Sequence, residues 1–312
     1  MKHALLRAGG LTAMLIATRA AAQAPDPVGK WFSDRGIAIR KVFDGSKDEQ
    51  NPASIFLVRE PTGKDRTFAS IDVAAKVREV EWNPGTSGSV LLYPVVDYHR
   101  STNASTPVDK AGGTARLEVR PVGLSVPRPP DASGPAPTLV GTYWSVAPTF
   151  ILDAKLSRDW TSQNNEQRYS IQVFPTGLRK GLPGSSIRGP KGTFFRYYPY
   201  VGLERYRFGT SGTDMTLTAG LARLWLEAWP VPTPTAQFLQ MTFDLTGRRR
   251  IGNEARLPSQ LSDVALGATV YLDGRGGDNS HVGIGVEYAN GRDVTAQFAR
   301  RERATIGLKV KF

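Results

Sequence analysis

The last stretch of the chain alternates apolar and polar residues with a period of two. One set of alternate positions is Ala304, Ile306, Leu308, Val310 and Phe312, and the other is Arg303, Thr305, Gly307, Lys309 and Lys311. Successive side chains of a β-strand point to opposite faces of the sheet. The segment is therefore predicted to be a strand with one apolar face and one wet face.

The same alternation recurs upstream, with turn-forming residues between the segments. It is clearest in residues 144–157, 239–246, 264–272 and 282–288, and further strands are predicted at 54–60, 67–82, 90–100, 114–122, 169–175, 194–208 and 215–229. Segments of roughly ten alternating residues are typical of transmembrane β-barrels. We predict an all-β fold, a single closed antiparallel transmembrane β-barrel of about twelve strands, with ten to fourteen left open. An even number places both termini on the periplasmic side.

Two segments break the alternation. Val80 and Trp82 switch face within residues 77–82, and Leu224 and Leu226 do so within residues 221–229. Both breaks are interpreted as β-bulges, or as strands leaving the hydrocarbon zone.

Aromatic residues gather near the ends of the predicted strands. They are Trp82, Tyr98, Trp144, Trp160, Trp225, Trp229 and Tyr288. Aromatic girdles at the two membrane interfaces explain such a distribution. The alternative is a soluble periplasmic β-sandwich binding protein, in which these residues are half-buried.

The N-terminus has the features of a secretory signal peptide, predicted as residues 1–22. Lys2 and Arg7 precede a short apolar run, and small residues stand before Gln23. Residues 23–52 are predicted to be a periplasmic N-terminal segment and 53–312 the barrel. Whether residues 30–51 form a tail or plug the barrel is left open.

Composition narrows the class of protein. The chain has no cysteine, so disulfides do not stabilise it. Its net charge is +12, and loss of Lys2, Arg7 and Arg19 with the signal leaves +9. Such a charge favours contact with anionic head groups or solutes. Nucleic acid is a poor partner for an exported protein.

The final strand, ATIGLKVKF, resembles the C-terminal signature of bacterial outer-membrane β-barrel proteins. The resemblance implies this fold, a location in the bacterial outer membrane, and Phe312 as the signal read by the barrel assembly machinery. Outer-membrane lipids are the other expected partner, with small anionic solutes as a further candidate. The resemblance implies no activity.

The sequence DYHRSTN contains the candidate catalytic residues Asp97, His99 and Ser101. Their spacing places all three on one face of a strand, where a proton relay from Ser101 to His99 is geometrically feasible. The spacing is similar to that of outer-membrane phospholipase A, whose site meets lipid at the outer wall. Here the triplet faces the interior, and the glycine-containing sequence after the serine is missing. An outer-membrane lipid-processing hydrolase is therefore the alternative function.

No cofactor or metal is predicted. His99 and His281 lie on different predicted strands, and the acidic residues from Asp44 to Glu49 lack the spacing of a calcium loop and are interpreted as a solvated linker. The predicted inward positions carry both signs of charge. They are Asp72, Lys76, Arg78, Arg116, Glu118, Arg120, Asp153, Lys155, Arg196, Glu204, Asp244, Glu287, Lys309 and Lys311. The charges of such a lining either pair in salt bridges that fill the barrel or leave a hydrated path through it. The leading hypothesis is therefore a narrow pore or a structural barrel.

Overall fold

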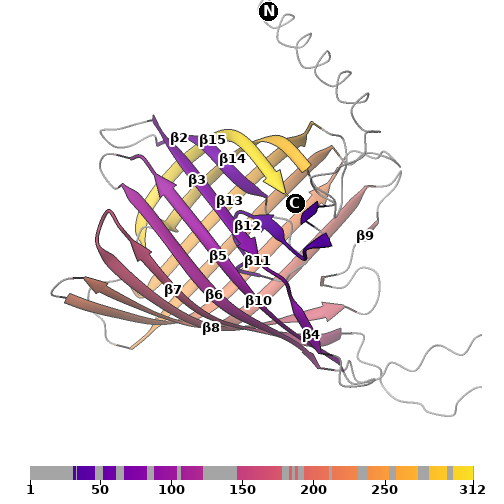
Figure 1. Ribbon diagram of the computed structural model, residues 1–312, viewed down its shortest axis with the longest axis horizontal. Helices are drawn as coiled ribbons and strands as arrows, with labels where there is room; N and C mark the ends of the chain where they lie inside the picture. Colours follow the sequence, from indigo (N-terminus) through magenta and orange to yellow (C-terminus); the bar gives the residue numbers. More distant parts are fainter. Residues whose placement is uncertain are drawn as a thin grey trace, which may run out of the picture.

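Twelve long strands form one closed antiparallel barrel in the computed structural model (Figure 1). The structure describes residues 31–32, 34–45, 52–60, 67–82, 88–103, 107–121, 146–177, 183–184, 187–188, 193–210, 213–230, 238–252, 258–272, 281–293 and 298–311. The strands of the wall are β2 (Ala53–Arg59), β3 (Thr67–Lys76), β5 (Gly88–Ser101), β6 (Val108–Pro121), β7 (Val146–Asp159), β8 (Asn164–Gly177), β10 (Phe194–Thr210), β11 (Thr213–Trp229), β12 (Leu239–Ile251), β13 (Gln260–Tyr271), β14 (His281–Asp293) and β15 (Ala299–Lys311). The all-β fold and the barrel of about twelve strands are confirmed, and the sandwich interpretation is wrong because the sheet closes on itself.

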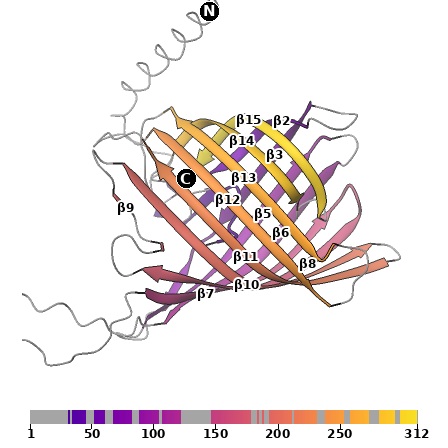
Figure 2. The same cartoon turned by 180° about the vertical axis from the view of Figure 1, so that it is seen from behind.

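Each wall strand pairs with the next one along the chain, and the last closes on the first. Leu57 of β2 lies opposite Ile306 of β15, and Ala69 of β3 lies opposite it on the other side. The views from the front and from behind both show the strands tilted around a common interior (Figures 1 and 2). Closure satisfies the backbone of every wall strand without leaving an open edge.

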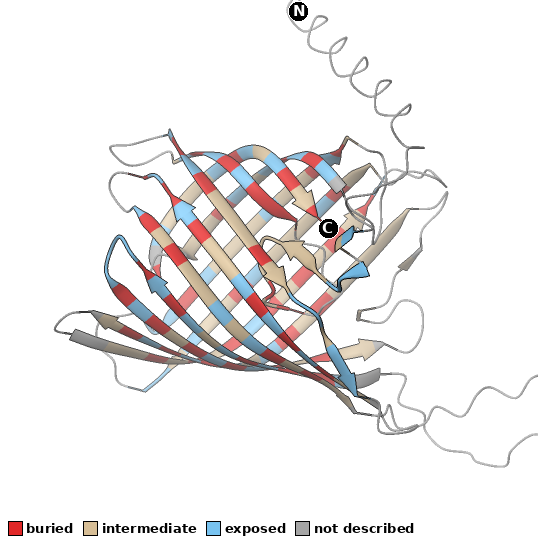
Figure 3. Cartoon of the chain, in the orientation of Figure 1, coloured by how far each residue is buried: buried red, intermediate tan, exposed pale blue. Residues whose placement is uncertain are grey.

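Buried and exposed residues alternate along the wall strands (Figure 3), and the exposed positions are largely apolar while many of the buried ones are charged. Ile306 and Leu308 are 53% and 40% exposed, whereas Lys309, which follows Leu308, is 3% exposed. Arg116 is 0% exposed on the inner face of β6. A water-soluble protein shows the reverse arrangement, so the outer surface of this sheet suits a hydrocarbon surrounding.

A bulge interrupts the wall between β3 and the short strand β4 (Val80–Trp82), as the sequence predicts. Lys76 pairs with Val95 and Val80 with Leu92, so four steps along one strand match three along the other. The extra residue reverses the parity, and Val80 and Trp82 face outward. Arg78, predicted to point inward, is exposed at this bulge.

The second predicted bulge, at residues 221–229, is wrong. β11 pairs with β10 in one unbroken register from Thr213 to Trp229. The alternation is lost in the sequence because Leu221, Trp225 and Trp229 point into the barrel, where they are buried. Trp225 and Trp229 are therefore not girdle residues, whereas Trp82, Trp160 and Tyr288 are exposed on the outside. Trp144 lies outside the described residues.

Apolar clusters occupy both ends of the interior and leave the charges between them. One cluster consists of Ile151, Phe174, Tyr198, Tyr200 and Trp225, near the end that holds the start of β2 and the end of β15. The other consists of Tyr206, Phe208, Leu217, Ala219, Leu261 and Phe298 at the opposite end. We call the first end the terminal end and the second the turn end.

The first wall strand is divided in two. The short strand β1 (Ala38–Arg40) pairs with β3 so that Arg40 lies opposite Ala74, and β2 continues with Ser54 opposite Asp72. Only Val73 lies between these two partners on β3. Residues 41–52 are thus an insertion at one point of an otherwise continuous strand. Together the three residues of β1 and the seven of β2 give ten, close to the 9–11 that cross a bilayer.

Candidate functional site

Residues 41–45, at the start of the inserted segment, lie in the barrel interior, where polar contacts from several strands hold them. Lys41 Nζ lies 2.8 Å from Glu287 Oε1 on β14, and Arg168 Nη1 on β8 donates to Asp44 Oδ1 over 2.9 Å. Arg116 Nη1 on β6 donates to the carbonyl oxygen of Gly45 over 2.7 Å. The segment therefore reaches from one wall of the barrel to the opposite one. The interpretation of the acidic stretch as a solvated linker is wrong for Asp44.

An apolar contact fixes the same segment from the side. Phe43 packs against Ala74, Leu91, Tyr93 and Val95 on the inner faces of β3 and β5. From the sequence, the apolar residues of β5 are predicted to lie on its outward face, and Leu92 and Val96 do face outward. The inward positions Leu91, Tyr93 and Val95 are apolar as well, so their contact with Phe43 was not predicted.

The two charged anchors have shifted pKa values. Burial by itself raises the pKa of Asp44, but the nearby Arg168, Lys155 and Arg223 outweigh it and hold that pKa well below its usual range. Burial likewise lowers the pKa of Lys41, and the carboxylates of Glu287 and Asp72 more than offset it, so the pKa is raised. Both side chains are therefore charged across the neutral range.

Paired charges line the middle of the interior around this segment. Arg116 and Asp153 form a bidentate pair at 2.6 and 2.7 Å, and Arg223 pairs with Asp244 at 2.9 Å through both carboxylate oxygens. Glu204 accepts from Arg168 and from Arg248, each over 2.7 Å. Partnering of this kind is what makes charges tolerable away from bulk water.

Most of the predicted inward residues have their side chains inside the barrel. Those with a buried side chain are Arg116, Glu118, Asp153, Glu204, Lys309 and Lys311, and those that are half-buried are Asp72, Lys76, Arg120, Lys155, Arg196, Asp244 and Glu287. Arg120 Nη2 donates to Glu118 Oε1 over 2.7 Å, and Lys155 Nζ donates to Asp97 Oδ1 over 2.8 Å. Phe312 lies outside the described residues.

Sequence reasoning missed several members of the network. Arg168 lies one residue before a predicted strand that in fact begins at Asn164, and Arg248 lies beyond the predicted end of another. Extending the period of two by one or two steps finds both. No sequence pattern points to Lys41 or Asp44, because they belong to no strand.

The candidate catalytic residues Asp97 and His99 contact different partners. His99 Nδ1 contacts Asp72 Oδ1 on the neighbouring strand, and Asp97 pairs with Lys155 instead. His99 Nε2 is buried and has no hydrogen-bond partner within the described residues. Ser101 Oγ accepts from the backbone N–H of Asn103 over 3.4 Å. The inward direction predicted for all three residues agrees with their positions on β5.

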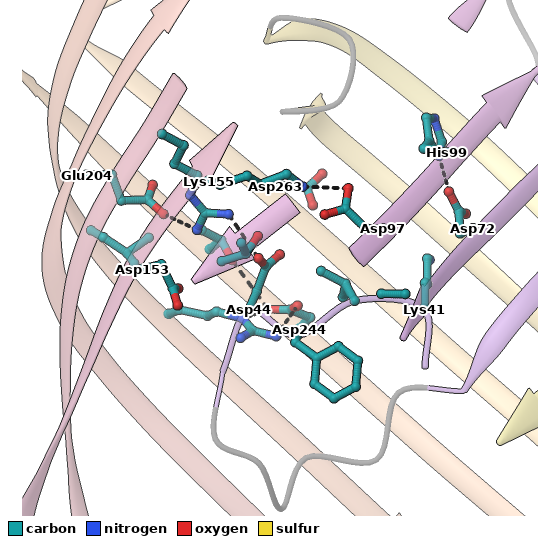
Figure 4. A pocket seen from close by; sticks show the side chains of 18 of the residues that line it. Lys41, Asp44, Asp72, Asp97, His99, Asp153, Lys155, Glu204, Asp244 and Asp263 are labelled. Atoms are coloured by element: carbon teal, nitrogen blue, oxygen red, sulfur yellow. Dashed lines mark hydrogen bonds and ion pairs between the residues drawn. The ribbon is translucent and has the colours of Figure 1, made fainter. Parts of the chain in front are cut away.

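A cavity of about 220 Å³ remains in the interior beside the inserted segment (Figure 4). Lys41, Asp44, Asp97, Glu204 and Asp244 approach it from different sides of the barrel. The wall of this cavity carries both signs of charge, with Arg292, Arg301 and Arg303 on the side of β14 and β15. Such a lining suits water and small polar solutes.

The described ranges contain neither a metal-binding cluster nor a membrane-spanning helix. No group of three or more histidine or acidic side chains there has the arrangement of a metal site. No helix in the described part of the chain is long and apolar enough to span a membrane.

Comparisons with known proteins include a distant likeness to a solved structure. No protein-family model matches the chain, and no curated protein matches its sequence. Among solved structures, the β domain of the Bordetella autotransporter BrkA is similar with a TM-score of 0.38 and 10% sequence identity, over 88% of this chain and 97% of that one. The likeness is too distant to bear on the activity of this chain. The closed wall, apolar outer surface and charged interior themselves fit an outer-membrane β-barrel.

Proposed function

We propose that the protein is an integral outer-membrane β-barrel whose interior is a narrow, hydrated path for small solutes, constricted by residues 41–45. The observation that carries the proposal is the inverted distribution of side chains. Exposed Ile306 and Leu308 alternate with buried Lys309 along a closed wall. A sheet satisfies its backbone in lipid only when it closes, and its lipid-facing side is then apolar.

The constriction follows from the inserted segment. Residues 41–45 lie across the interior at the level of the charges, with the cavity of about 220 Å³ beside them. A barrel of this strand number falls between filled small barrels and open large porins, so an internal segment decides how wide the path is. The mixed charge of the lining gives the path only a weak preference between cations and anions.

The register provides a clean test of this constriction. Deletion of residues 41–52 joins Arg40 to Ala53, which then takes the place opposite Val73 with no change of parity. We expect the deletion variant to form the same barrel and to conduct ions several times better than the wild type in planar lipid bilayers. Arg35→Gln is the matched control, because Arg35 is exposed, precedes β1 and contacts Trp31 instead of the interior wall.

Different outcomes contradict different parts of the proposal. Equal conductance of the wild type and the deletion variant contradicts the constricting role of the inserted segment. If neither protein gives a current above background, the proposed pore function is contradicted and the protein is a structural barrel. Solubility without detergent after signal removal removes the membrane location itself.

A second function rests on the contact between Asp72 and His99. A carboxylate on Nδ1 orients the ring, and the free Nε2 is then the atom able to accept a proton from a serine hydroxyl. Ser101 is the neighbouring inward residue on the same strand. The hydrolase alternative predicts phospholipid hydrolysis that is lost in Ser101→Ala, and hydrolysis that survives this substitution rules Ser101 out.

A further inference from the structure

Exposed arginines surround the outside of the barrel near its turn end. They come from β2, β5, β7, β10, β12 and β15, and all have outward parity. They are Arg59, Arg100, Arg158, Arg205, Arg207, Arg249 and Arg300. We call this set the arginine girdle.

The arginine girdle follows the edge of the apolar outer surface. Arg59 stands two residues beyond the exposed Leu57, Arg158 two beyond Leu156 and Arg205 two beyond Leu203. Each of these three arginines is thus the next outward side chain after an exposed leucine, in the direction of the turn end. This is the depth at which the head groups of a bilayer begin.

Five of these seven arginines have no charged or hydrogen-bonding partner for their side chains among the described residues. Arg59, Arg100, Arg205, Arg249 and Arg300 make no side-chain hydrogen bond or ion pair with any described residue. Among the outward carboxylates near this rim, Asp109, which lies opposite Arg100 in the register, and Glu302 are half-buried, and Tyr288 donates to Glu302. The guanidinium groups of the rim are therefore exposed to the medium outside the barrel.

The opposite rim differs in kind. Its exposed outward residues include Val80, Trp82, Met241 and Val282. The two interfaces of the barrel are thus chemically distinct, with arginine at one end and apolar or aromatic side chains at the other.

We propose that the arginine girdle binds the phosphate groups of the glycolipid in the outer leaflet of the outer membrane. The guanidinium fork matches phosphate oxygens in pairs, and a basic rim is attracted to an anionic lipid surface. Because the arginines encircle the barrel, they fit a leaflet that surrounds it better than a protein that docks on one side. The choice of leaflet rests on the proposed outer-membrane location with periplasmic termini, which puts the turn end outside.

The test compares a girdle variant with a control from the other rim. The girdle variant carries Arg59→Gln, Arg100→Gln, Arg205→Gln and Arg249→Gln, and the control carries Arg78→Gln. Each purified barrel in detergent is mixed with lipopolysaccharide, and the amount of co-eluting lipid and the midpoint of heat-modifiable gel mobility are measured. Lipopolysaccharide with its phosphates removed, phosphatidylglycerol and inorganic phosphate serve as further probes.

We expect lipopolysaccharide to raise the midpoint of the wild type and of Arg78→Gln, and its affinity for the girdle variant to fall by at least about tenfold. The dephosphorylated form should have little effect on any of them. Equal binding to the girdle variant, or to the dephosphorylated lipid, overturns the proposal. Stronger stabilisation by phosphatidylglycerol or by inorganic phosphate assigns the rim to another leaflet or to a soluble anion, and overturns it as well. A wild type that shows no heat-modifiable mobility without lipid instead contradicts the proposed membrane barrel.

Discussion

Individual interior charges are tolerated because each has a defined partner. Arg116 is fully buried and is held by Asp153 and by the carbonyl oxygen of Gly45. Removing one member of such a pair leaves the other charged and unsatisfied in a poorly solvated place, which is costlier than losing a surface pair.

Arg116→Ala is therefore expected to lower the free energy of unfolding by about 3 to 5 kcal/mol. Arg78→Ala is the control, because Arg78 is exposed, and a substitution there is expected to change stability by about 0.5 kcal/mol or less. Urea unfolding of both variants in lipid vesicles measures the difference. Equal losses for the two would show that the interior pair contributes no more than a surface charge.

The anchors of the inserted segment should hold over a wide range of pH. The pKa of Asp44 is lowered by folding, so its contribution is present above the unfolded value of about 3.9 and is lost as the pH falls through the lower folded value. The pKa of Lys41 is raised, so its contribution is present below about 10.4 and is lost as the pH rises through the higher folded value. We expect the segment to stay docked from about pH 4 to about pH 10.

A nitroxide attached at Val42→Cys measures this docking, and the absence of native cysteine makes the label specific. Its mobility should be constant across that range and rise in stronger acid. Asp44→Asn should make the label mobile at neutral pH as well. A label that loosens between pH 5 and 9 would contradict the anchoring by these two residues.

Among the strands, β11 shows how an element can carry apolar residues on both faces. Leu224 and Leu226 face outward, whereas Trp225 and Trp229 face the interior. The ring of Trp229 stacks with Phe194 at 5.6 Å and with Tyr271 at 5.7 Å, and its Nε1 donates to Glu227 Oε1 over 2.6 Å. The inner wall at this end is thus lined by packed aromatic rings, and the period of two disappears from the sequence where this happens.

Trp229→Ala should destabilise the barrel by about 3 to 5 kcal/mol, since it removes a fully buried ring from a packed cluster. Trp82→Ala is the comparison, because this ring is exposed on the outside at the same end of the barrel. We expect the loss for Trp82→Ala to be clearly the smaller of the two in urea unfolding. A larger loss for Trp82→Ala would mean that the outer contact with lipid matters more than the inner cluster.

The whole molecule presents two indications of its orientation, and they disagree. An even strand number places both termini together, by analogy on the periplasmic side. Bacterial barrels also have short periplasmic turns and long extracellular loops. Here the long connections, residues 122–145 and 178–193, lie at the terminal end, and the turn end has connections as short as 211–212.

Single cysteines at each end decide between these orientations. Thr161→Cys lies at the turn end and Pro230→Cys at the terminal end, and both positions are exposed. We expect a membrane-impermeant maleimide to label Thr161→Cys on intact cells, and Pro230→Cys only after lysis. Labelling of Pro230→Cys alone on intact cells would reverse the barrel and bring the arginine girdle to the inner leaflet.

The sequence by itself determined the wall of this protein. Alternation such as that of Ile306, Leu308 and Lys309 fixes which side chains face lipid, because the pleat of a strand leaves no other choice once the sheet closes. The direction of Asp97, His99 and Ser101 followed from the same rule. What the wall encloses was decided only by the tertiary structure. His99 contacts Asp72 on another strand, and Lys41 and Asp44 contact Glu287 and Arg168 across the interior. These contacts join residues far apart in the chain, and no local pattern of residues encodes them.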